Sequence, residues 1–93
     1  MVKLTGIQLI ANERDKQIVE HSYTAENDVI KNKFHQLTYA AMSILKSDRA
    51  QLDPPIFWSA NLWKKMIAKS EKERLIISAS LIAAELDRLQ AAE

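Results

Sequence analysis

Basic and aromatic side chains gather in the second half of the chain. The set comprises Trp58, Trp63, Lys64, Lys65, Lys69, Lys72 and Arg74. Amines and guanidinium groups pair with phosphate, and aromatic rings stack on nucleobases. Several of these residues also fall at the predicted start of a helix, where free backbone N–H groups suit an anion. The combination predicts a site for a small phosphate-bearing, nucleotide-like ligand.

Three residues of the first quarter could complete this site. Arg14 and Gln17 lie on a predicted N-terminal helix, and Tyr23 follows it with a ring that could stack on a base. The candidate ligand-binding residues are therefore Arg14, Gln17, Tyr23, Trp58, Trp63, Lys64, Lys65 and Arg74. A structural interpretation stays open for each: lysines on a solvated face, tryptophans in the core and Arg14 in a salt bridge.

The carboxylates lack the spacing of a metal-dependent hydrolase. A helical nucleotide pyrophosphohydrolase holds Mg²⁺ with Glu-x-x-Glu and Glu-x-x-Asp pairs, whose spacing of three puts both ligands on one helical face. Neither pattern occurs here, and the pairs Glu13 and Asp15, Glu71 and Glu73, and Glu85 and Asp87 are spaced by two, about 200° apart on a helix. With no cysteine and no local zinc partner for either histidine, we expect no catalytic residue, no metal and no cofactor.

The composition is that of one helical domain spanning residues 1–93. Hydrophobic residues make up 47% of the chain, while one glycine and two prolines are too few for the turns of a sandwich or barrel. A net charge of +1 provides no field that would attract extended nucleic acid or a membrane. The N-terminus shows neither a signal peptide nor a membrane-spanning run. We therefore expect a cytoplasmic protein of a bacterial host cell.

Sequence periodicity in the first half predicts two helices. A capping box, Thr5-x-x-Gln8, precedes apolar residues at helical spacing and predicts a helix over about 6–20. The polar stretch 21–32 is predicted to be a connection with room for one short helical turn. Apolar residues at spacings of three and four then predict a second helix over about 31–46.

The second half is predicted to hold one long helix. The Pro54-Pro55 pair ends the preceding helix, and residues 56–68 are predicted to form short turns. A second capping box, Ser70-x-x-Glu73, predicts a helix over about 71–90. The whole is an all-α, small three- to four-helix bundle.

The C-terminal helix also predicts association between copies. Its segment from Leu75 to Ala84 contains no charge, which indicates burial on nearly every side, in a central helix or at a subunit interface. A chain this short buries only about 60% of its unfolded surface, so a partner copy would add burial that the monomer lacks. We therefore expect a homo-oligomer.

Several short motifs occur along the chain. They are Ile10-Ala11-x-Glu13-Arg14-x-x-Gln17, Thr24-x-Glu26, Ala40-Ala41, Pro54-Pro55 with Trp58, Trp63 and Lys64, Arg74-Leu75, and the segment from Leu81 to Leu89. In this order they resemble a family of small, mostly uncharacterised helical proteins encoded by tailed phages and prophages. The resemblance covers nearly the whole chain, and the C-terminal motif is its closest local match.

The chain departs from that family in an acidic loop. Where the family has Glu-His-Asp-Asp, this chain has Glu26-Asn27-Asp28-Val29, and where a helix begins Gly-Glu-Leu it has His35-Gln36-Leu37. Neutral residues thus replace several groups that could hold a divalent cation, which weakens any metal-dependent activity.

Together these features predict a non-catalytic accessory protein of a phage or prophage. It would bind and sequester a nucleotide-like signal of host defence in a pocket between subunits. An alternative is a protein-interaction module that inhibits a host factor through exposed residues of the C-terminal helix, with Ile77 and Leu81 as candidates. A third is a degenerate Mg²⁺-dependent nucleotide pyrophosphohydrolase-like protein.

Overall fold

The computed structural model describes residues 3–21, 24–46 and 53–93, and these residues form an all-α fold. Across the described ranges there are five helices and no strand: α1 (Gly6–His21), α2 (Ala25–Lys31), α3 (Gln36–Ile44), α4 (Ala60–Ile67) and α5 (Glu71–Ala91). The predicted all-α class is confirmed, with more helices than the three or four expected.

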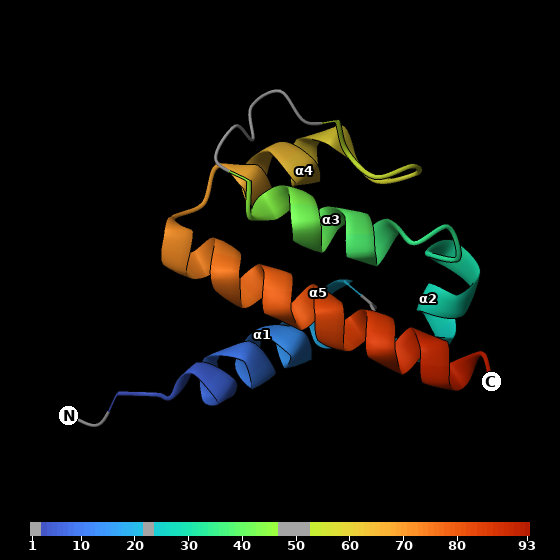
Figure 1. Cartoon of the computed structure of the whole chain (residues 1–93), viewed down its shortest axis with the longest axis horizontal. Helices are drawn as coiled ribbons and strands as arrows, with labels where there is room; N and C mark the ends of the chain where they lie inside the picture. Colours follow the sequence, from blue (N-terminus) through green and yellow to red (C-terminus); the bar gives the residue numbers. More distant parts are fainter. Residues whose placement is uncertain (1–2, 22–23, 47–52) are drawn as a thin grey trace.

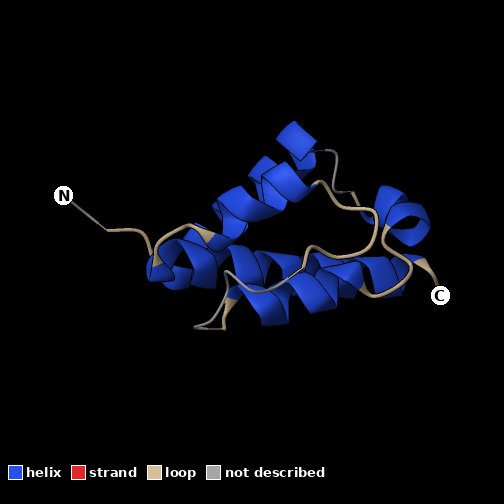
Figure 2. Cartoon of the chain, turned by 90° about the horizontal axis from the view of Figure 1, so that it is seen from above, coloured by secondary structure: helices blue, strands red, loops and turns tan. Residues whose placement is uncertain are grey.

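Helix α5 is the element around which the others are arranged. Helices α1, α2 and α3 all contact it. In Figure 1, α1 and α3 lie on opposite sides of α5, α2 lies near its C-terminal end, and α4 lies beyond α3. Figure 2, the view from above, shows the same helices joined by loops. No helix of the described residues is long and apolar enough to cross a membrane.

The apolar core joins α3, α4 and α5. Its buried side chains are Leu37, Ala40, Ala41, Ile44, Trp63, Met66, Ile77, Leu81 and Ala84. The Trp63 ring lies 6.3 Å from both the Tyr39 and the Trp58 rings, between centroids. Neither α1 nor α2 contributes to this cluster of described residues, so another kind of contact must hold them.

Thr5 and Gln8 form the full capping box predicted for α1, and Ser70 caps α5 through its hydroxyl group. The Gln8 amide donates to Thr5 Oγ1 over 3.2 Å, and the Thr5 amide donates to Gln8 Oε1 over 2.8 Å. At the start of α5, the Glu73 amide donates to Ser70 Oγ over 3.3 Å. These bonds satisfy N–H groups that have no partner within the helix, and both helix starts therefore lie where the sequence predicts them.

The boundary between α2 and α3 differs from the prediction. A single helix was expected over 31–46, whereas the chain turns between Lys31 and Gln36. The buried Gln36 side chain accepts from the Phe34 amide over 2.8 Å and donates to the Lys31 carbonyl over 3.0 Å. These bonds satisfy backbone groups that a continuous helix would have paired, which is why the turn is stable.

The segment 56–68 is more regular than predicted. Helix α4 occupies Ala60–Ile67, where only short turns were expected. Ser59 caps it, with its Oγ accepting from the Leu62 amide over 3.3 Å. Helix α5 extends over Glu71–Ala91, close to the expected 71–90. Its uncharged segment is buried on the inner face only, where Ile77 and Leu81 lie in the core.

Candidate functional site

Buried polar residues form much of the contact between α1, α2 and α5. Arg14 on α1 donates from Nη2 to Asp87 Oδ2 over 3.2 Å. On α5, Arg88 donates from Nε to Glu85 Oε1 and from Nη2 to Glu85 Oε2 over 3.3 Å. Asp28 of α2 is 1% exposed. These polar contacts attach α1 and α2 to α5, since neither helix contributes a residue to the buried apolar cluster.

Glu85 is held in its charged form by several donors. Burial raises the pKa of Glu85, but hydrogen bonds from Arg88, Thr38 and His35 outweigh it and lower the pKa below the ordinary value. The Thr38 hydroxyl donates to Glu85 Oε2 over 2.9 Å, and His35 Nδ1 lies 3.5 Å from the same oxygen. Thr38 lies on α3 and His35 in the turn before it, so Glu85 links both of these to α5.

Asp28 is the opposite case. Burial raises the pKa of Asp28 above its ordinary value, although the Asn32 side chain and the Arg14 charge act to lower it. The Asn32 amide donates to Asp28 Oδ1 over 2.7 Å, while Oδ2 is buried with no hydrogen-bond partner among the described residues. Oδ2 has therefore lost its hydrogen bonds to water on folding without gaining a hydrogen bond from any described residue in their place.

A chain of hydrogen bonds leads from Asp28 to a surface pocket. The Asn32 Oδ1 atom accepts from the Trp58 indole Nε1 over 2.8 Å, while its amide group binds Asp28. Asn32 is 4% exposed, so this bond is shielded from water. The indole of Trp58 is consequently fixed in orientation by a buried polar chain that starts at α2.

We call this surface cavity the aromatic pocket. Its volume is about 510 Å³, and the residues that line it are Ile30, Lys31, Asn32, Lys33, Phe34, Phe57, Trp58, Ser59 and Leu62. The rings of Phe34 and Phe57 lie 6.2 Å apart between centroids and are 56% and 79% exposed. The Lys33 amine lies 5.3 Å from the centroid of the Phe34 ring.

Two backbone positions at the aromatic pocket are in the left-handed region. Phe57 has φ of 69° and His35, which follows Phe34, has φ of 65°. Residues other than glycine adopt such angles at a cost of about 1–3 kcal/mol, and they cluster at functional sites. At Phe57 the strained backbone holds a large aromatic ring in solvent, although such rings are usually buried.

The charges around the aromatic pocket are of one sign. Lys31 and Lys33 are its charged residues, and no carboxylate is among the described residues that line it. A ligand with both an aromatic ring and an anionic group would meet complementary partners here.

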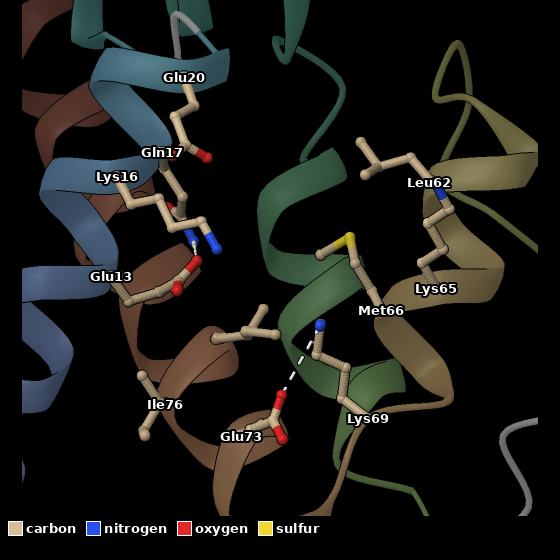
Figure 3. Close-up of a pocket in the computed structure, with 11 residues that line it drawn as sticks. Glu13, Lys16, Gln17, Glu20, Leu62, Lys65, Met66, Lys69, Glu73 and Ile76 are labelled. Carbon is tan, nitrogen blue, oxygen red and sulfur yellow. Dashed lines mark hydrogen bonds and ion pairs between the residues drawn. The ribbon is translucent and has the colours of Figure 1, made fainter.

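A second cavity, the mixed-charge pocket, lies between α1, α4 and α5 (Figure 3). Its volume is about 410 Å³, and its lining comprises Glu13, Lys16, Gln17, Glu20, Leu62, Lys65, Met66, Lys69, Glu73, Ile76 and Ile77. In Figure 3, side chains of α1 face side chains of α4 across it. Three lysines are matched by three glutamates, and Lys69 Nζ lies 3.6 Å from Glu73 Oε2. This balance gives a multiply charged phosphate little net attraction.

Three of the eight predicted site residues line one of these two pockets. Trp58 lines the aromatic pocket, whereas Gln17 and Lys65 line the mixed-charge pocket. Gln17 is 3% exposed and donates to Glu13 Oε2 over 3.4 Å. Leu62 lines both pockets. The structure thus divides the predicted site rather than assembling it.

The other predicted residues have structural contacts or lie elsewhere. Trp63 is a core residue, and Arg14 binds Asp87, as the structural interpretation of each expected. Arg74 donates to the carbonyls of Lys69 and Ile44, each over 3.0 Å, and so caps the end of α3. Lys64 is exposed on α4, and Tyr23 lies outside the described residues.

Sequence reasoning missed Phe34, Phe57, Lys31 and Lys33. Phe34 falls within the single helix expected over 31–46, where it would lie on the apolar face, and the turn at His35 instead exposes it. The pattern Lys31-Asn32-Lys33-Phe34 is the signal that could have been used, since it places two amines beside an aromatic ring.

The side chains that could bind a metal ion are spread over the described structure. Nowhere in residues 3–21, 24–46 and 53–93 do three His, Asp or Glu side chains come together as a possible metal site. The carboxylates of the buried cluster are instead bound by arginine, threonine and asparagine donors.

Relatives do not supply a further guide to function. Compared with family models, with curated proteins and with solved structures, the chain matches none.

Proposed function

We propose that the chain is a non-catalytic binding protein that holds a small phosphate-bearing, nucleotide-like molecule in the aromatic pocket. One observation carries the proposal: two exposed phenylalanine rings and Trp58 share a pocket with two lysines and with no carboxylate among its described lining residues. A nucleobase would stack on the rings, and its phosphate would pair with the amines of Lys31 and Lys33.

Size and orientation support this choice of pocket. A volume of about 510 Å³ falls in the ordinary range for small-molecule sites. The indole of Trp58 is already fixed by Asn32, so it loses little freedom when a ligand binds. The mixed-charge pocket is of similar size but has no aromatic side chain among the described residues that line it.

The proposed biological role is sequestration. A protein that retains its ligand without turnover lowers the free concentration of that ligand. Together with the resemblance to phage and prophage proteins, retention suggests a role in a bacterial cytoplasm, where the ligand would be a nucleotide signal of host defence.

Direct binding measurements test the proposal. We would incubate the purified chain with a panel of linear and cyclic nucleotides and measure binding by calorimetry and native mass spectrometry. We expect a nucleotide to bind to the wild type, and Phe57→Ala to weaken its affinity by about 5- to 150-fold, since stacking contributes roughly 1–3 kcal/mol per base. Lys31→Ala should weaken binding and reduce its dependence on salt.

A matched control distinguishes the two pockets. Lys65→Ala removes an amine from the mixed-charge pocket and should leave the affinity unchanged. Failure of the whole panel to bind would overturn the proposal. Loss of binding in Lys65→Ala with full binding in Phe57→Ala would show that the site is wrong. Recovery of the ligand as a cleaved product would contradict the non-catalytic role.

The two alternatives make different demands on the chain. A protein-interaction module would have to use residues other than Ile77 and Leu81, which are buried at 7% and 0% exposure. A pyrophosphohydrolase-like activity would require Mg²⁺-dependent turnover of a nucleotide, which the same panel would detect as a cleaved product.

A further inference from the structure

The outer face of α5 carries a regular apolar stripe. Its residues are Leu75, Ala79, Ile82, Leu86 and Leu89, spaced by four, three, four and three. Spacing of this kind places side chains in one line along a helix and is typical of helix pairs in coiled coils. The four large side chains are 46–58% exposed, although the opposite face of the same helix lies in the core.

Helix α3 widens this stripe into a surface with a socket. Met42 and Leu45 are 60% and 47% exposed. A cavity of about 220 Å³ lies between α3 and α5, lined by Thr38, Ala41, Met42, Leu45, Ile82, Glu85 and Leu86. A cavity beside projecting leucines can accept a leucine from an equivalent helix, as knobs enter holes in paired helices.

Little on this surface would select a charged partner. Glu85 is the charged residue among the described residues of the socket, and its oxygens are bound by Arg88 and Thr38. A partner recognised by charge would therefore find no free complement in the socket. A surface without charge, whose apolar residues recur at regular spacing along a helix, is suited to pair with the same surface of a second copy.

The stripe is also symmetric about its centre. Leu75 and Leu89 are each seven residues from Ile82. An antiparallel pair of α5 helices centred on Ile82 would set Leu75 beside Leu89 of the second copy, and the small Ala79 near its larger Leu86. Antiparallel pairing also opposes the two helix dipoles, which is favourable.

The chain exposes more surface than a compact monomer of its mass. A folded monomer of 10.6 kDa is expected to expose about 5,500 Å², whereas this chain exposes 6342 Å². An interface of standard size, which removes ~800 Å² from each partner, would bring the exposed area close to that of a compact monomer.

We infer that a second copy of this chain covers the face formed by α3 and α5, with the two α5 helices antiparallel about Ile82. The dimer does not depend on the nucleotide-like ligand, because the aromatic pocket is lined by residues outside this face. It also accounts for the uncharged segment of α5, whose inner side lies in the core of one chain and whose outer side would contact the other.

Sedimentation and cross-linking test the dimer. The full chain should sediment as a dimer, and Leu86→Lys should convert it to a monomer with unchanged helicity, since this side chain is 58% exposed. The chain contains no cysteine, so Ile82→Cys introduces a single thiol that should form a disulfide with its copy at the symmetry axis under mild oxidation.

The matched control is Val19→Cys, which places a thiol on α1 at a valine that is 81% exposed and lies outside the stripe. We expect Ile82→Cys to cross-link much faster than Val19→Cys. A wild type that stays monomeric up to its solubility limit would overturn the inference. Equal cross-linking of the two variants would overturn the antiparallel arrangement, and a dimer that persists in Leu86→Lys would show that another face pairs.

Discussion

At the level of single residues, Asp28 has the least favourable environment in the buried cluster. Its carboxylate is desolvated, one of its oxygens has no partner among the described residues, and its pKa is raised by burial. A folded chain with this property binds a proton more tightly than the unfolded chain. The contribution of Asp28 to stability is therefore greatest at acid pH and falls as the pH rises from 3.8 through the raised pKa.

This linkage predicts the effect of Asp28→Asn. The amide removes the buried charge and can still accept from Asn32. We expect the free energy of unfolding at pH 7 to rise by on the order of 1 kcal/mol, because a neutral amide costs less to bury than a carboxylate charge. Well below pH 3.8, where Asp28 is protonated in both states, the variant and wild type should be nearly equally stable. Urea unfolding at both pH values measures the difference.

A neighbouring carboxylate provides the control. Asp87→Asn changes a side chain that is 48% exposed and is bound by Arg14, so it should not stabilise the protein at pH 7. If Asp28→Asn lowered the stability at pH 7 more than in acid, the Asp28 charge would be stabilising and its pKa would be lowered rather than raised.

Residue types alone could predict which side chains were suited to bind ligands, but not what each one contacts. Trp58 lies at a pocket as its type suggested, whereas Arg14 and Arg74 are bound by Asp87 and by backbone carbonyls. A guanidinium group that suits a phosphate equally suits a carboxylate or a helix end. Which partner it meets depends on contacts between distant segments, and sequence spacing does not specify these.

At the level of elements, α1 is attached differently from the rest. It contributes no residue to the apolar core of the described chain. Its contacts with α5 include the Arg14–Asp87 ion pair and a bond of 3.2 Å from the Ser80 hydroxyl to the Ile10 carbonyl. Polar contacts contribute less net stability than burial of large apolar side chains. Helix α1 should therefore open more readily than α3.

Hydrogen exchange measures this difference. We expect the amides of α1 to exchange faster than those of α3, where Leu37 and Ile44 are fully buried. Arg14→Gln should speed exchange in α1 by about tenfold while leaving α3 unchanged, because it removes a charged hydrogen bond. Lys16→Gln, at an exposed position of the same helix, is the control. Equal protection of α1 and α3 would contradict this account.

Helix boundaries were predictable where local side chains set them. The caps at Thr5 and Ser70 fix the starts of α1 and α5 through bonds within four residues. The break before α3 escaped prediction because Gln36, an ordinary helix-forming residue, binds the turn instead, and also reaches the carbonyl of Ile56 over 3.4 Å. A contact across 20 residues has no signature in local periodicity.

At the level of the whole molecule, the outer face of α5 exposes large apolar side chains that a self-contained helical bundle would bury. Absence of charge from Leu75 to Ala84 predicted burial all round or a subunit interface, and the single chain buries only the inner side. Leaving Ile82 and Leu86 half-exposed forgoes burial that would stabilise the fold. A second copy would restore that burial, so folding and association should be coupled.

Coupling predicts that thermal stability depends on protein concentration. Dimerisation is second order, so raising the concentration favours the folded pair over two unfolded chains, and the wild-type Tm should rise with each tenfold increase. The Tm of Leu86→Lys should not change, because this variant folds as a monomer. Scanning calorimetry over a hundredfold range, with circular dichroism to confirm helicity, makes the comparison. A wild-type Tm independent of concentration would mean that each chain is stable alone, and that the apolar stripe serves some purpose other than pairing.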